Sequence, residues 1–268
     1  MDKIADSYLP FSANITNISL TPFSGFIKLG ATDVLENDRI IGGVKLSGNF
    51  KENEYLLAFE NFKTRIDKIW AFHYFNRYYA SQEGLIERHQ VSNVWFSKAY
   101  SFYSLLTWRN YVQFRYDKTS FGSYDLLGLL AKDKSKYWGS MRTELTYDNT
   151  IILTTNILQG WRWKIFSEYY QGFHNTKLNL ITVGFDVRAY FPWYKSMISA
   201  HRIAWGTSFG NTRLMYLLGG TNQTFFSKFD TQNPFDTTYN YEFLTIATNL
   251  RGLPVNCRNG NTFFVINN

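Results

Sequence analysis

The stretch that decides the fold is Asn-Leu-Ile-Thr-Val-Gly-Phe-Asp-Val-Arg-Ala-Tyr-Phe at residues 179–191. Apolar and polar residues alternate there with a period of two, which is typical of a β-strand with one apolar face. One face carries Ile181, Val183, Phe185, Val187, Ala189 and Phe191, and the other carries Thr182, Gly184, Asp186, Arg188 and Tyr190. The alternation spans about 35 Å. That length exceeds a typical globular strand and suits a tilted strand that crosses a bilayer.

The same alternation recurs along the chain, with full charges on the polar face and aromatic residues on the apolar face. It is found at residues 39–50, 69–80, 109–116, 139–149, 161–171 and 197–209. Aromatic residues near strand ends fit the interfacial girdles of a membrane barrel, and the candidates are Tyr147, Trp161, Phe191 and Trp193. We therefore predict an all-β protein of about twelve strands and favour an antiparallel transmembrane barrel. A soluble β-sandwich is the alternative fold.

Composition excludes several other classes of protein. Aromatic residues make up 19% of the 268 residues, which favours strands, and no apolar run is long enough for a transmembrane helix. The single Cys257 excludes an internal disulfide, and the four histidines are scattered, so we predict no metal and no cofactor. The net charge of +7 comes from Lys and Arg spread singly rather than in blocks, so we expect no nucleic-acid partner.

An enzyme is a third possibility to be weighed. Ser199 and His201 lie two residues apart on one strand face, as a nucleophile and a base would, but the sequence indicates no third group to orient them. We therefore expect no enzyme and no small-molecule substrate. Exposed aromatic platforms that bind glycans on a soluble β-protein remain a separate alternative.

Connections divide into short turns and longer segments. Turns are predicted at residues 149–150, 174–176 and 210–211, and Pro192 is expected to close the strand before it. Residues 118–136 are interpreted as a polar connection. Residues 211–260, rich in Gly, Asn, Thr and Phe, lack sustained alternation and are interpreted as one long loop with a function of its own. The last strand is predicted at Asn261 to Asn268.

From about residue 137 onward, a series of short motifs carries a family resemblance through its order and spacing. The motifs are ELTYDNT at 144–150, GWR at 160–162, FDVRAYF at 185–191, RIAWGTSFG at 202–210, LGG at 218–220, LRG at 250–252 and GNTFFVIN at 260–267. Together they resemble the bacterial surface antigen family, which includes the outer-membrane assembly factors BamA and TamA. The resemblance covers about half of the chain.

The resemblance implies a sixteen-stranded barrel, of which residues 1–268 form a part, and a loop at about 211–260 that folds into the lumen. The loop tip would be Arg251-Gly252, although Leu253 stands where the family has an aromatic residue. An arginine in the lumen needs carboxylates or other acceptors. The candidate lumen residues are Glu144, Asp148, Glu168, Asp186, Arg188 and Arg202, and Gly219, Gly220 and Gly260 are expected at turns or in the loop.

The resemblance also implies a function in the bacterial outer membrane, in contact with its lipids. It would be the insertion or translocation of client outer-membrane proteins, by opening a weak seam to which a client strand adds. A passive or structural pore whose basic lumen favours anions is the alternative. We expect the export signal before Met1 and the remaining strands after Asn268.

Overall fold

The structure is a computed structural model, and it describes most of the chain. The described residues are 8–10, 24–47, 52–80, 86–122, 132–154, 157–173, 178–194, 197–220, 229–248, 250 and 252–268. Within them the protein is all-β, as predicted. Two sheets are present, a large antiparallel one of twelve strands and a small one of four.

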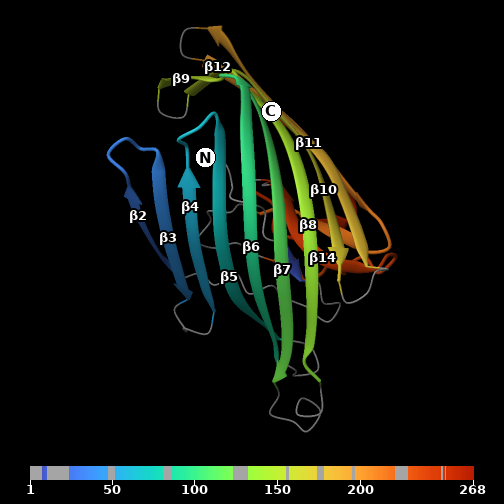
Figure 1. The fold of residues 1–268 in the computed structure, drawn as a ribbon. Helices are drawn as coiled ribbons and strands as arrows, with labels where there is room; N and C mark the ends of the chain where they lie inside the picture. Colours follow the sequence, from blue (N-terminus) through green and yellow to red (C-terminus); the bar gives the residue numbers. More distant parts are fainter. Residues whose placement is uncertain are drawn as a thin grey trace.

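The large sheet follows the order of the sequence along almost its whole width. Its path is β2 (Ser24–Thr32), β3 (Asp38–Ser47), β4 (Asn53–Asn61), β5 (Ile66–Ala80), β6 (Ile86–Tyr103), β7 (Leu106–Gly122), β8 (Lys134–Asp148), β10 (Ile157–Gly172), β11 (Asn179–Tyr194), β12 (Met197–Phe209) and β16 (Thr262–Asn267). The short β9 (Ile151–Thr154) pairs with β10 beside this path. Figure 1 shows the strands as a curved wall. Among the described residues the wall is open, with β2 and β16 at its two edges.

The small sheet has the order β1-β14-β13-β15 and lies on the inner side of the curved wall (Figure 1). Its strands are β1 (Leu9–Pro10), β13 (Arg213–Leu218), β14 (Tyr241–Thr248) and β15 (Arg258–Gly260). β13 and β14 are parallel to each other. The face of the large sheet that carries the small sheet is called the inner face below, and the opposite one the outer face.

The two sheets share one apolar core. Leu214 and Tyr216 of β13, together with Phe243 of β14, pack against Trp138 of β8 and Tyr170 of β10. On its other side β13 places Met215 and Leu217 against Leu244 and Val255. A strand that is buried on both faces is apolar throughout, so it shows no alternation.

That burial explains where the sequence interpretation of residues 211–260 is wrong in detail, because the segment contains three strands rather than only loop. The polar connection predicted at 118–136 is also too long. β7 continues to Gly122 and β8 begins at Lys134, and their pairing extends to Thr119 opposite Lys134. Polar residues at these strand ends concealed the strands.

The end of β13 depends on two glycines that the sequence analysis had marked. Gly219 and Gly220 have φ angles of 104° and 75°, in the left-handed region that favours glycine. Both are buried, and the amide of Gly220 donates to the carbonyl of Leu253 at 2.8 Å. A Cβ atom on Gly219 would overlap the carbonyl oxygen of Pro254. Gly260 lies in β15 with open space around its Cβ position.

We predict that Gly219→Ala destabilises the protein by more than the about 1–3 kcal/mol that left-handed backbone alone costs. The added methyl group must also displace the backbone at Pro254. Gly260→Ala is the matched control, since it adds the same methyl group in the same sheet without a contact. Urea unfolding in detergent micelles measures both. Equal midpoints for the two variants would contradict the described turn.

Candidate functional site

The inner face of the wall carries a buried network of charges at its centre. Arg142 of β8 donates to Glu144 at 3.0 Å and lies 3.6 Å from Glu168 of β10, which is its direct cross-strand partner. These three residues are only 7%, 6% and 5% exposed. Lys164 approaches Glu144 at 3.8 Å, and the Arg142 guanidinium lies 4.7 Å from the ring centre of Phe166. Burial of so much charge requires this mutual pairing.

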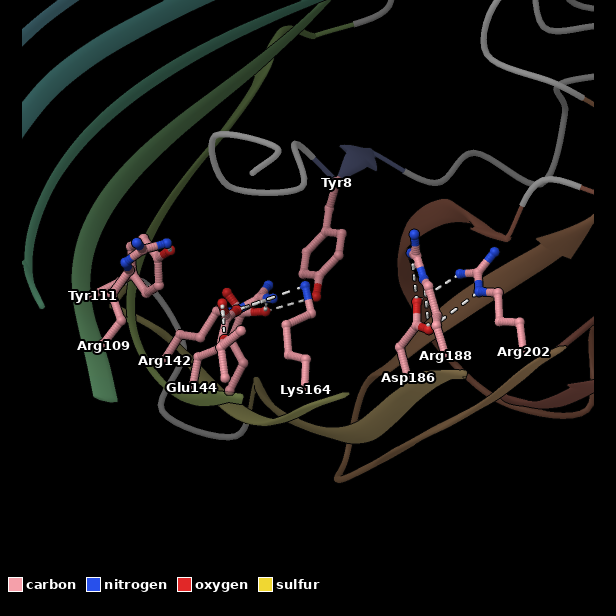
Figure 2. Close-up of polar contacts among 11 residues, drawn as sticks. Tyr8, Arg109, Tyr111, Arg142, Glu144, Lys164, Asp186, Arg188 and Arg202 are labelled. Carbon is pink, nitrogen blue, oxygen red and sulfur yellow. Dashed lines mark hydrogen bonds and ion pairs between the residues drawn. The ribbon is translucent and has the colours of Figure 1, made fainter. Parts of the chain in front are cut away.

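Tyr8 connects that network to the small sheet, as Figure 2 shows. Its hydroxyl donates to Glu168 at 2.6 Å, and its carbonyl accepts a hydrogen bond from Arg115 at 2.7 Å. Arg115 also binds Asp117 at 2.7 Å and lies 4.5 Å above the ring of Phe243 in β14. A further ion pair joins Lys136 of β8 to Glu242 of β14. The small sheet is therefore held by charged side chains as well as by the apolar core.

A second charged cluster lies on β11 and β12. Asp186 accepts two hydrogen bonds from Arg188, at 3.1 and 2.9 Å, and two from Arg202, at 3.2 and 2.7 Å (Figure 2). Arg188 and Arg202 are direct cross-strand partners, and Arg188 also faces Arg162 of β10. Like charges in such positions repel each other. Asp186 therefore offsets a repulsion that the register creates, and Asp148 does the same for Arg162 at 3.2 Å.

The candidate lumen residues all lie on this inner face, and each carboxylate has a basic partner within the wall. Those partners are Arg142 and Lys164 for Glu144, Arg162 for Asp148, Arg142 for Glu168, and Arg188 with Arg202 for Asp186. Arg251, the proposed loop tip, lies outside the described residues. Gly252 is exposed, with a φ of 83°. The pairing of Arg251 with these carboxylates stays a prediction.

The first half of the wall carries charge on the same face, both in β5, whose alternation the sequence predicted, and in β4 and β6, which were not predicted. His73 of β5 lies 2.8 Å from Glu54 of β4, and Arg77 contacts Glu54 at 3.4 Å. His89 of β6 lies between Glu87 at 3.1 Å and Thr119 at 3.2 Å. The period of two in residues 87–99 could have revealed β6, because Glu87, His89, Val91 and Asn93 all point inward and are buried.

The described residues contain no group of three or more His, Cys, Asp or Glu side chains that could hold a metal ion. Cys257 is a free thiol whose Sγ donates to the carbonyl of Leu218 at 3.3 Å. No helix in the described part of the chain is long and apolar enough to cross a membrane.

Comparisons with known proteins give no assignment. No protein-family model matches the chain. No curated protein matches it significantly. The resemblance to the bacterial surface antigen family therefore rests on the motifs alone.

We predict that Asp186→Asn destabilises the protein by about 1–3 kcal/mol, because Arg188 and Arg202 then face each other without a countercharge. Asp133→Asn is the control. Asp133 pairs with Lys118 at 3.2 Å, but half of its side chain is exposed, so its loss should change stability by less than about 1 kcal/mol. Urea unfolding in detergent micelles measures both, and equal effects would contradict a structural role for Asp186.

We predict that Tyr8→Phe loosens the N-terminal strand β1 from the wall, because Glu168 loses a hydrogen bond at 2.6 Å while the ring packing remains. Limited proteolysis should cleave the N-terminal segment faster in this variant, by roughly tenfold if about 1.4 kcal/mol is lost. Tyr239→Phe is the control, since Tyr239 is exposed in a turn of the small sheet. Cleavage at the unaltered rate in Tyr8→Phe would contradict the docking role.

Proposed function

We propose that the large sheet forms part of the wall of a bacterial outer-membrane β-barrel of the BamA/TamA-like type, which assists insertion or translocation of outer-membrane proteins. The observation that carries the membrane location is an inverted distribution of side chains, in which apolar residues are exposed on the outer face and charged residues are buried on the inner face. Along β8, Met141 is 59% exposed on the outer face, whereas the adjacent Arg142 is buried on the inner face. The same inversion separates Phe114 from Arg115 on β7.

The inversion extends across the whole wall. Large apolar side chains are exposed on the outer face of every long strand, among them Leu29, Ile40, Leu57, Phe72, Val94, Val112, Ile165, Ile203 and Ile266. Complete burial of one fully exposed side chain of this kind is worth about 1.5–3 kcal/mol, and soluble monomers rarely expose continuous apolar patches larger than a few hundred Å². An apolar solvent around the outer face removes this cost, and that arrangement is the one found in membrane barrels.

Strand length and aromatic placement support the same proposal. β6, β7, β10 and β11 have 18, 17, 16 and 16 residues, more than the about 9–11 that a tilted strand needs to cross a bilayer. Exposed aromatic residues gather at the strand ends where β6 meets β7 and β11 meets β12. These are Phe102, Tyr103, Trp108, Trp161, Phe191 and Trp193. They fit one interfacial girdle.

The position of the small sheet favours the insertion function over an open pore. It occupies the inner side of the wall, where it buries Trp138 and Tyr170 and pairs Glu242 with Lys136. An occupied lumen does not favour steady conduction, whereas the proposed insertion function needs the wall rather than an open channel. The family resemblance supplies the class of client, which is other outer-membrane proteins.

A passive anion pore is the second candidate, because basic side chains line the inner face. They are Arg142, Arg162, Lys164, Arg188 and Arg202. Each of them contacts a carboxylate, so the net positive charge of the face is small. Planar-bilayer recordings separate the candidates. We expect low conductance, together with faster folding of a client β-barrel protein into vesicles that contain this chain. Large, steady, anion-selective currents without an effect on the client would favour the pore.

We predict that Met141→Arg destabilises the vesicle-bound protein by about 2–4 kcal/mol, because a charge on the lipid face must be desolvated. Val34→Arg is the control, since Val34 is an exposed apolar residue in the turn between β2 and β3. Urea unfolding from vesicles, after flotation shows that the protein is bound, gives both values. Two results would favour a soluble glycan-binding protein whose outer face is exposed to water. One is that the unaltered chain does not float with the vesicles, and the other is that Met141→Arg changes the stability by less than about 0.5 kcal/mol.

A further inference from the structure

Three polar side chains meet on the outer face at one corner of the wall. Ser199 and His201 lie two residues apart on β12, and Asn268 directly follows β16. Because Arg202 pairs with Asn267 in the antiparallel ladder, Asn268 comes next to His201. The Nε2 atom of His201 lies 3.2 Å from the Ser199 Oγ atom, and its Nδ1 atom lies 2.9 Å from the Asn268 Oδ1 atom.

These contacts suit a neutral histidine with one particular tautomer. An amide oxygen only accepts, so Nδ1 of His201 carries the proton and donates to Asn268. In the neutral imidazole, Nε2 then has a free electron pair that can accept the Ser199 hydroxyl proton. The indole Nε1–H of Trp193 donates to the same Ser199 Oγ atom at 2.6 Å. In this arrangement the Ser199 hydroxyl donates to the base while its oxygen accepts from Trp193.

We propose that Ser199, His201 and Asn268 form a hydrolytic site for carboxylic esters of membrane lipids. A nucleophile, a base that accepts its proton and a group that orients the base are the three parts that such chemistry needs. Ser199 and His201 are the catalytic residues. Asn268 and Trp193 are positioning residues, because they act on the histidine and on the hydroxyl.

The reaction takes two balanced steps. The Ser199 Oγ atom attacks the ester carbonyl carbon while its proton passes to His201 Nε2. The bond to the leaving alcohol then breaks, and the same proton passes from Nε2 to the alcohol oxygen. Water next attacks the acyl-serine, gives its proton to Nε2, and releases the carboxylic acid as that proton returns to Oγ.

The surroundings of the site define the substrate class. The Phe191 ring centre lies 5.9 Å from that of His201, and Trp193 is 77% exposed beside Ser199. Exposed Met197 and Ile266 extend the apolar surface on β12 and β16. Long acyl chains match this surface better than short or polar ones. This choice of substrate rests on the proposed location of the outer face in lipid.

The test uses the full chain in detergent micelles with a fluorescent fluorophosphonate, which reacts with activated serines, and a long-chain p-nitrophenyl ester. We expect labelling and ester hydrolysis by the unaltered chain and neither with Ser199→Ala. Thr207→Ala, which removes a hydroxyl from the same face of β12, should leave both unchanged.

The orienting role of Asn268 has its own readout. Asn268→Ala should lower kcat by about tenfold or more, and Asn268→Asp should restore it, because a carboxylate holds the same tautomer of the histidine. A purely structural role of Asn268 would not give rescue by Asp.

Labelling of Ser199→Ala at the rate of the unaltered chain would overturn the proposal, and so would an unaltered chain that neither reacts with the probe nor cleaves the ester. Vesicle flotation of the same preparation distinguishes failure of the hydrolytic site from failure of the proposed membrane location. A chain that floats with vesicles but does not react contradicts only the hydrolytic site. A chain that reacts only with short soluble esters and does not float contradicts the membrane location and the lipid substrate.

Discussion

A β-sheet must place successive side chains on opposite faces, and this protein uses the alternation to bury charge and to expose apolar residues. Arg142, Glu144 and Glu168 lie within the molecule, whereas Met141 and Ile165, their neighbours in the wall, face outward. A charge that leaves water must be paired. The pairing of charges across β8, β10, β11 and β12 is therefore the condition on which the wall depends. Between β8 and β10 the register supplies it, because it sets Arg142 directly opposite Glu168. Between β11 and β12, Asp186 supplies it by pairing with both Arg188 and Arg202.

Docking of the small sheet on the wall also depends on the pairing of buried charges. A polar inner face offers little apolar surface on which a second sheet could dock, so the contact combines two kinds of interaction. Trp138, Tyr170 and Phe243 form an apolar centre. Around it, the hydroxyl of Tyr8 satisfies Glu168 and the carbonyl of Tyr8 satisfies Arg115. The N-terminal strand thus completes a charge network whose other members lie more than a hundred residues later or on other strands.

The sequence predicted most of the large sheet, and the reasons for its omissions are physical. β11 was found because apolar and polar residues alternate along most of its length, and β12 because Ile203 and Trp205 alternate with Arg202 and small residues. β13 was missed because Leu214, Met215, Tyr216 and Leu217 are buried on both faces, which removes the alternation. The ends of β7 and β8 were missed because Lys118, Lys134 and Lys136 place polar side chains on both faces there. The inner-face carboxylates were found as candidates, but their partners depend on register, which no local pattern reveals. Asn268 could not be connected with His201 for the same reason.

The central claim is that the outer face of the wall lies in lipid, and the most direct test follows the alternation residue by residue. Cys257 would be replaced by Ser, and single cysteines at Val112, Gln113 and Phe114 of β7 would carry nitroxide spin labels in vesicles. Accessibility of each label to oxygen, which concentrates in lipid, is compared with accessibility to a water-soluble nickel complex. The account predicts high oxygen and low nickel accessibility at 112 and 114, with low oxygen accessibility at 113. Labels at 112 and 114 that are reached by nickel more readily than by oxygen would contradict it.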